Sequence, residues 1–158
     1  MSEGTSSGIL EVTVVSPARP IFEGEAKFVT APAWDRIGGE RSLYGGQAEE
    51  KLAVGQLGIL PRHAPLVAAL GSGLLRIGLD GGKVARYAVS GGFLKVGDNR
   101  VTILVDMAVT EADVDGAEAQ RDLDATLSEL KHPRSEAEFE ELLDRRAWSE
   151  TRIKLAKK

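Results

Sequence analysis

The pattern of hydrophobic residues changes once along this chain, from a period of two to a period of three to four. Alternation such as that of Leu10–Val14 is typical of a half-buried strand. From Ala119 to Leu130 the hydrophobic residues instead follow one face of a helix. The sequence therefore predicts a β domain over residues 9–108 and a helical segment over residues 109–158.

Glycine-rich turns divide the β half into hairpins. Asp80-Gly81-Gly82 separates two apolar runs, and Gly97–Arg100 separates two more. Glycine readily supplies the positive φ that tight hairpin turns need. Ser90-Gly91-Gly92 is expected to join one hairpin to the next. Many short strands with such turns favour a β-sandwich or a barrel.

The last fifty residues or so predict two antiparallel helices on a short turn. Residues 131–134 interrupt the helical pattern, and Ser135 with Glu138 forms a capping box for the second helix. Trp148 and Leu155 lie on another side of that helix from its main apolar stripe. The helix therefore has two faces to cover, and a hairpin of this size needs a surface on which to dock.

Two segments fit neither half. Residues 1–8 are expected to be a disordered N-terminus. Residues 34–54 are rich in glycine and lack sustained periodicity, with Arg41–Tyr44 the only β-like piece. We interpret 34–54 as a long loop inserted in the β domain, either mobile or functional.

Composition excludes several classes of protein. The net charge of −4 and the isoelectric point near 5.3 argue against binding nucleic acid through a broad basic surface. The absence of cysteine excludes disulfides, thiolate catalysis and cysteine-ligated zinc. No apolar run approaches the roughly 20 residues that span a bilayer, and the N-terminus has no signal-peptide pattern. Any membrane association is therefore expected to be indirect.

The inventory of reactive residues argues against catalysis. The two histidines, His63 and His132, are far apart in sequence, and there is neither a Gly-x-Ser-x-Gly elbow nor a phosphate-binding glycine loop. Two distant histidines also make a metal site improbable on chemical grounds. A hydrolase that uses His63 would lack a partnered nucleophile. We interpret the chain as a non-catalytic interaction module.

Several segments, taken in order, resemble the ε subunits of F-type, proton-translocating ATP synthases. The matching stretches cover roughly residues 9–33 and 55–158 and include Ile9–Pro17, Ile21–Glu25, Gly58–Leu66, Ala88–Leu94 and Arg100–Leu104. The resemblance implies a β + α protein, with an N-terminal ten-stranded β-sandwich and a C-terminal antiparallel two-helix hairpin.

The resemblance also implies a function. Such a subunit is a rotor component of the central stalk that links the γ subunit to the c-ring and couples proton translocation to ATP synthesis. Its hairpin inhibits ATP hydrolysis in many bacterial members, which adds the α and β subunits of the catalytic head as further partners. The expected location is peripheral, on the cytoplasmic side of a bacterial plasma membrane. The alternative is a free-standing β-sandwich that binds a small ligand beneath a helical lid.

The resemblance places the c-ring contact near the loop between two prolines. The residues implied are Gln56, Arg62, His63, Ala64 and Pro65. Pro61 and Pro65 fix φ and restrict their neighbours, so the loop can hold one shape without ladder hydrogen bonds. Family members usually carry an acid where Gln56 stands, so a charge-assisted contact there would be weaker. A different role for His63, bonding a carbonyl of its own loop, is compatible with this contact.

Basic residues in the second helix are the candidates for an inhibitory contact. They are Arg145, Arg146, Arg152 and Lys154, accompanied by the aromatic Trp148. Two interpretations remain open, namely a contact with an acidic loop on a catalytic β subunit and simple complementarity to the helix dipole.

Nucleotide binding is expected to be lost. Some family members bind ATP through Ile/Leu-Asp-x-x-Arg-Ala, and the matching positions here include Asp115, Glu118 and Ala119. Glu118 replaces the arginine, and like charges about 4 Å apart in a partly buried site cost on the order of 4 kcal/mol. We therefore expect absent or very weak ATP binding, and no cofactor.

Overall fold

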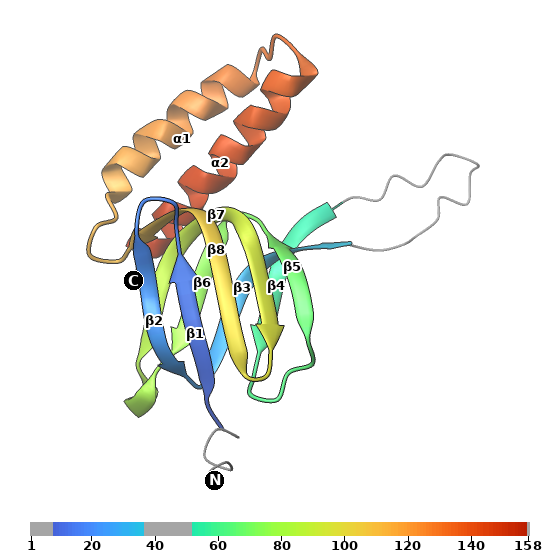
Figure 1. Ribbon diagram of the computed structural model, residues 1–158. Coiled ribbons are helices and arrows are strands. Elements are labelled where there is room, and N and C mark those ends of the chain that lie inside the picture. The colour runs from blue at the N-terminus through green and yellow to red at the C-terminus, as the bar shows by residue number, and fades with distance from the viewer. Residues whose placement is uncertain (1–7, 37–51, 158) are drawn as a thin grey trace, which may run out of the picture.

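The computed structural model describes residues 8–36 and 52–157. Within them, eight strands form one hydrogen-bonded network that folds into two layers, with a helical hairpin at one end (Figure 1). The strands are β1 (Leu10–Val15), β2 (Pro20–Ala26), β3 (Phe28–Arg36), β4 (Leu52–Ile59), β5 (Leu66–Leu70), β6 (Gly73–Gly78), β7 (Val84–Gly97) and β8 (Arg100–Thr110).

The strand order is β2-β1-β8-β7-β5-β3-β4, and β6 pairs with β3 and β7. The predicted sandwich is confirmed, although the described residues form eight strands rather than ten. Part of the difference lies in β7, because residues 83–89 and 93–96 were predicted as separate strands on either side of Ser90-Gly91-Gly92. They are one strand, and its first part pairs with β6 while its second part pairs with β5.

A bend at Gly91 and Gly92 allows β7 to serve both layers. Their φ angles are 65° and 120°, a region that side chains with a Cβ rarely adopt. A Cβ at Gly92 would also overlap the carbonyl oxygen of Leu104 on β8. Ser90-Gly91-Gly92 therefore bends a continuous strand and does not act as the predicted connection between hairpins.

The core is built from aliphatic side chains on the inner faces of the two layers. In β1 and β8, which pair in parallel, Val12 lies opposite Val101 and Val14 opposite Ile103, so their buried rows coincide. Each fully buried aliphatic side chain contributes roughly 1.5–3 kcal/mol. The largest buried side chains in the sandwich are Leu10, Val12, Val14, Val29, Ile59, Leu75, Ile77, Val89, Leu94 and Ile103.

The segment predicted as an inserted loop, residues 34–54, is strand at both of its ends. β3 continues through Arg36 and β4 begins at Leu52, with Trp34 paired to Val54. Both ends of the segment interpreted as loop are therefore strand. Residues 37–51, including the β-like piece Arg41–Tyr44, lie outside the described residues, as does most of the predicted disordered N-terminus.

Two helices, α1 (Gly116–Leu130) and α2 (Glu136–Ala156), form the predicted antiparallel hairpin. β8 continues to Thr110, just past the expected boundary at residue 108. The side chain of Asp115 accepts a hydrogen bond from Glu118 N–H and caps α1. Ser135 caps α2 by accepting from Glu138 N–H, as the sequence predicts.

The C-terminal part of α2 docks on β6 and β7. Leu142 is buried, and so are Thr151 and Leu155 farther along the helix. The close approach of α1 to α2 leaves little room at Gly116, where a Cβ would lie 2.9 Å from that of Ala156. The folded hairpin thus buries Leu155, which needs no outside partner, whereas Phe139 and Leu143 of α2 stay 41% and 38% exposed.

The bend in β7 yields a test of the architecture. Gly92→Ala should lower the free energy of unfolding by about 3 kcal/mol or more, because it adds a backbone overlap to an unfavourable φ. Gly97→Ala, at the end of the same strand, has open space around its Cβ and is the matched control. Urea denaturation followed by circular dichroism measures both, and equal losses would contradict this explanation of the bend.

Candidate functional site

The connection between β4 and β5, residues 60–65, lies at the end of the sandwich opposite the hairpin (Figure 1). It runs beside the turn between β7 and β8, and Arg62 N–H donates to Asn99 Oδ1 at 2.6 Å. His63 N–H donates to Leu60 O at 3.1 Å, which closes a tight turn within the connection. We call residues 60–65 the β4–β5 loop.

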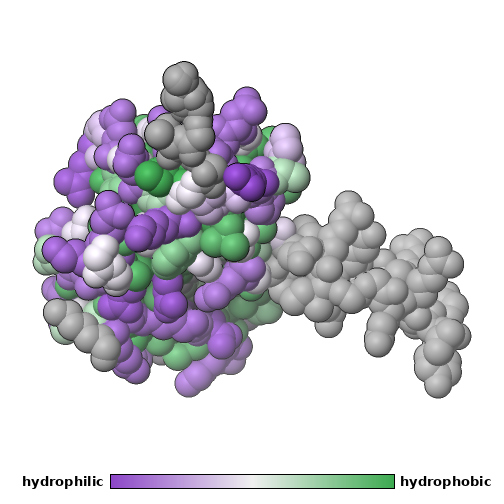
Figure 2. Space-filling view, turned by 90° about the horizontal axis from the view of Figure 1, so that it is seen from below, coloured by the Kyte–Doolittle hydropathy of each residue, from purple (hydrophilic) through white to green (hydrophobic). Residues whose placement is uncertain are grey.

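The β4–β5 loop presents its side chains outward. Arg62, Ala64 and Pro65 are exposed, and Leu60 retains 63% of its accessible surface. Arg62 has a φ of 68°, which is unusual for a residue with a side chain. Seen from this end, the molecular surface is mostly hydrophilic with scattered hydrophobic residues (Figure 2).

His63 is half-buried, and its Nδ1 lies 2.7 Å from Ala64 O. This geometry agrees with the interpretation that the imidazole bonds a carbonyl of its own loop. Since Nδ1 donates to that carbonyl, Nε2 is left for a partner. Within the described residues, the side-chain hydrogen bonds of His63 include no serine or other nucleophile.

Gln56 is not part of the same cluster. It lies in β4, opposite Pro32 of β3, and its side chain is exposed. It lines a groove of about 330 Å³ on the flank of the sandwich, together with Arg76 of β6 and Lys154 of α2. The structure therefore brings Arg62, His63, Ala64 and Pro65 together and leaves Gln56 on the strand that leads to them.

A second surface lies on the outer face of the layer formed by β1, β8, β7 and β5. Val15 pairs with Leu104, Leu104 with Phe93, and Phe93 with Ala69, so these four side chains form a row across four strands. Phe93 is 61% exposed and Leu104 53% exposed. We call this row the apolar outer face.

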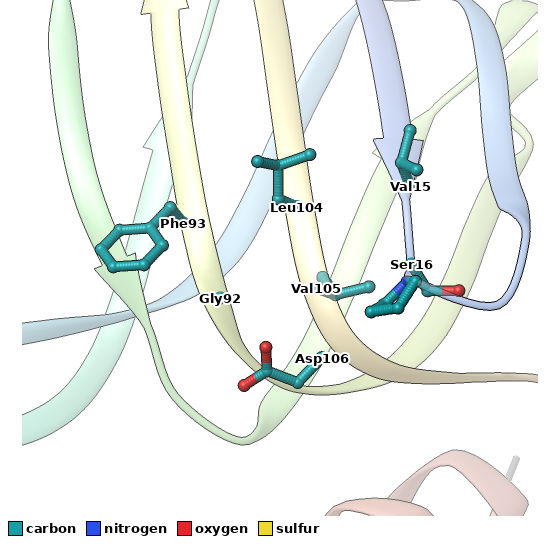
Figure 3. A pocket seen from close by; sticks show the side chains of 8 residues that line it. Val15, Ser16, Gly92, Phe93, Leu104, Val105 and Asp106 are labelled. Carbon is teal, nitrogen blue, oxygen red and sulfur yellow. The ribbon is translucent and has the colours of Figure 1, made fainter.

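A shallow pocket of about 290 Å³ opens on the apolar outer face (Figure 3). Phe93 and Leu104 stand side by side from neighbouring strands, with Asp106 below them (Figure 3). This surface was not predicted from the sequence. The available signal was that the adjacent pairs Phe93-Leu94 and Leu104-Val105 are apolar on both faces of their strands.

The basic residues proposed for an inhibitory contact are largely paired within the hairpin. Arg145 contacts Glu129 at 3.2 Å, and Arg146 contacts Glu150 at 2.8 Å. Lys154 is exposed and forms no ion pair with another described residue.

Arg152 is the most deeply buried of these basic residues. Its side chain is only 14% exposed, and its guanidinium contacts Asp122 Oδ2 at 2.9 Å and Ser149 Oγ at 3.2 Å. The same group lies 5.4 Å from the centroid of the half-buried Trp148 ring. In the folded hairpin, Arg152 and Trp148 therefore act in packing α2 against its neighbours.

The positions of the degraded nucleotide motif have structural roles. Asp115 caps α1 and Ala119 is fully buried. Glu118 is exposed in the first helical turn, where an acid favours the helix dipole. Within residues 8–36 and 52–157, no group of three or more acidic, histidine or cysteine side chains is placed to hold a metal ion. No helix in the same ranges is long and apolar enough to cross a membrane.

Similarity to known proteins identifies the family of this chain. A family model described as "ATP synthase, Delta/Epsilon chain, beta-sandwich domain" matches residues 37–111, beginning inside the segment 34–54. The ATP synthase epsilon chain of Neisseria meningitidis serogroup C is 35% identical over 139 residues, which are 85% of this chain and 86% of the relative. This chain belongs to the ATP synthase epsilon chain family.

Other comparisons agree with the membership in the epsilon chain family. The ATP synthase epsilon chain of Desulforamulus reducens is 39% identical over 110 residues, which are 68% of each chain. A chain in the structure of the Euglena gracilis mitochondrial ATP synthase, which contains OSCP, F1 and the c-ring, superposes with a TM-score of 0.72. It is 22% identical, and the alignment covers 96% of this chain and 83% of that one, which supports the shared fold.

The packing of Arg152 can be tested in this epsilon-family hairpin. Asp122→Asn removes the charge that faces a mostly buried guanidinium and should lower the free energy of unfolding by about 1–2 kcal/mol. Glu129→Gln, whose partner Arg145 is half-exposed, is the control and should cost less than about 1 kcal/mol. Chemical denaturation monitored by circular dichroism gives both values, and equal values would refute the structural role of Arg152.

Proposed function

We propose that this chain is a non-catalytic central-stalk subunit that links γ to the c-ring and couples proton translocation to ATP synthesis. The observation that supports the proposal is the presence of two distinct exposed surfaces on one sandwich. The apolar outer face lies on a flank of the β domain, and the β4–β5 loop lies at its end (Figure 1).

The apolar outer face is the surface that suits γ. Exposed apolar side chains gathered in a row, bordered by polar residues such as Lys95 and Asp106, are typical of protein–protein contacts. The strands beneath are held by ladders on both sides, so the face is preformed and loses little entropy on docking.

The β4–β5 loop is the surface that suits the polar loops of the c-ring. It offers a guanidinium from Arg62, an imidazole from His63 and exposed Leu60 from a compact, hydrogen-bonded turn. Membrane association is then indirect, and the chain is placed on the cytoplasmic side of a bacterial plasma membrane by its partners.

Inhibition of ATP hydrolysis by the hairpin is a separate part of the proposal. It requires α2 to leave β6 and β7, which exposes Leu155 and separates α1 from α2 if the helices extend. Contact with the α and β subunits by Arg145 and Arg146 would also require exchange of their present partners, Glu129 and Glu150. The folded hairpin is therefore the state that limits inhibition, and its docking free energy sets how often the arm is released.

The assignment of γ to the apolar outer face gives the main experiment. Phe93→Asp should weaken association with γ at least about tenfold, because a charge would be buried at the centre of the contact. Val84→Asp is the matched control, since Val84 is an exposed apolar residue of the same strand outside the row. Co-elution and binding kinetics with purified γ measure the effect.

The outcomes of this experiment separate the two main hypotheses. Loss of γ binding in Phe93→Asp alone supports the stalk function. Failure of the unaltered chain to bind γ would favour the free-standing ligand-binding sandwich. Equal weakening by both substitutions would instead indicate that the apolar outer face is not the γ contact.

Loss of nucleotide binding is the second prediction of the proposed function. Because Glu118 stands where the family motif has arginine, isothermal titration with ATP and Mg²⁺ should show no saturation below about 1 mM. Glu118→Arg is the informative variant, since it restores the motif residue at an exposed site. Micromolar ATP affinity of the unaltered chain would overturn the prediction.

A further inference from the structure

The turn between β7 and β8 has a demanding backbone. Gly97 pairs with Arg100, and the two residues between them, Asp98 and Asn99, have φ angles of 52° and 60°. Two consecutive positive φ angles match the twist of a tight hairpin, and Asn and Asp are the side-chain residues that best tolerate them. The turn alone therefore accounts for an Asn, an Asp or a Gly at position 99.

Asn99 does more than form this turn. Its backbone carbonyl accepts from Glu11 N–H at 2.8 Å, at the beginning of β1. Its side-chain Oδ1 accepts from Arg62 N–H at 2.6 Å, in the β4–β5 loop. One residue thus joins three segments that are far apart in sequence at the end of the sandwich opposite the hairpin (Figure 1).

The bond to Arg62 falls where the β4–β5 loop most needs support. Residues 61–65 belong to no strand, and Arg62 itself has a φ of 68°. A left-handed conformation at a residue with a Cβ costs roughly 1–2 kcal/mol and persists only when its surroundings hold it. The short bond from Arg62 N–H to Asn99 is a contact from outside the loop that favours this conformation.

We propose that Asn99 is the positioning residue of the β4–β5 loop. Its side chain locks Arg62 in the left-handed conformation, so the β4–β5 loop presents one preshaped surface. The identity of the partner at this surface, the c-ring, rests on the proposed function. The lock itself rests only on the geometry of Arg62 and Asn99.

Substitutions at Asn99 can separate the lock from the turn. Asn99→Gly keeps the positive φ and removes the acceptor, whereas Asn99→Asp keeps both. Asp98→Gly is the matched control, because Asp98 lies in the same turn with a positive φ and is exposed. All three variants should retain the fold, which the amide protection of core residues such as Ile103 verifies.

The first readout is hydrogen exchange of the Arg62 amide in the full chain, measured by NMR. Asn99→Gly should accelerate this exchange at least tenfold, while Asn99→Asp and Asp98→Gly should leave it near the value of the unaltered chain. Unchanged exchange in Asn99→Gly would overturn the lock and leave the proposed function untouched.

The second readout is coupling in ATP synthase reconstituted with each variant in vesicles. ATP-driven proton pumping per ATP hydrolysed should fall at least twofold with Asn99→Gly and recover with Asn99→Asp. Pumping unaffected by Asn99→Gly, with faster Arg62 exchange, would overturn the positioning role and the assignment of this loop to the c-ring. If the same variants still bind γ, the assignment of this chain to the central stalk stands even when the positioning role is overturned.

Discussion

Continuous pairing of β7 on both sides is the constraint on which the rest of this molecule depends. β7 contacts β6 with its first part, β5 with its second and β8 along most of its length. This arrangement requires a bend, and Gly91 and Gly92 supply it through conformations open to glycine. Phe93 then lies on the outer face of the second part of β7. The helix α2 docks on β6 and β7.

The features that sequence predicted best are those set by local chemistry. Alternation in β1 indicated which side chains face the core, because a one-residue slip would expose the whole buried row. The cap at Ser135 and the two-helix hairpin follow from short-range patterns in the same way. The ordered segments that resemble the epsilon chain family were sufficient to identify the family.

The features that sequence did not predict depend on contacts between distant segments. Nothing near Arg152 in sequence reveals that Asp122 neutralises it, so its basic character indicated a partner surface instead. The apolar outer face was hidden because Phe93 and Leu104 meet only after β7 and β8 pair. Gln56 was grouped with Arg62 because the family resemblance implies that both lie at the c-ring contact. In the structure Gln56 lies in β4, opposite Pro32, and Arg62 lies in the loop that follows this strand.

The bond between Glu11 N–H and Asn99 O has a practical consequence for anyone who attaches a probe to this protein. It places the beginning of β1 beside the turn between β7 and β8, whose Asn99 contacts the β4–β5 loop, so a tag joined at residue 8 starts at that end of the sandwich. The turn between α1 and α2, residues 131–135, is exposed and lies at the opposite extreme (Figure 1). A dye or bead attached there would report rotation with the least disturbance of the surface that Asn99 shapes.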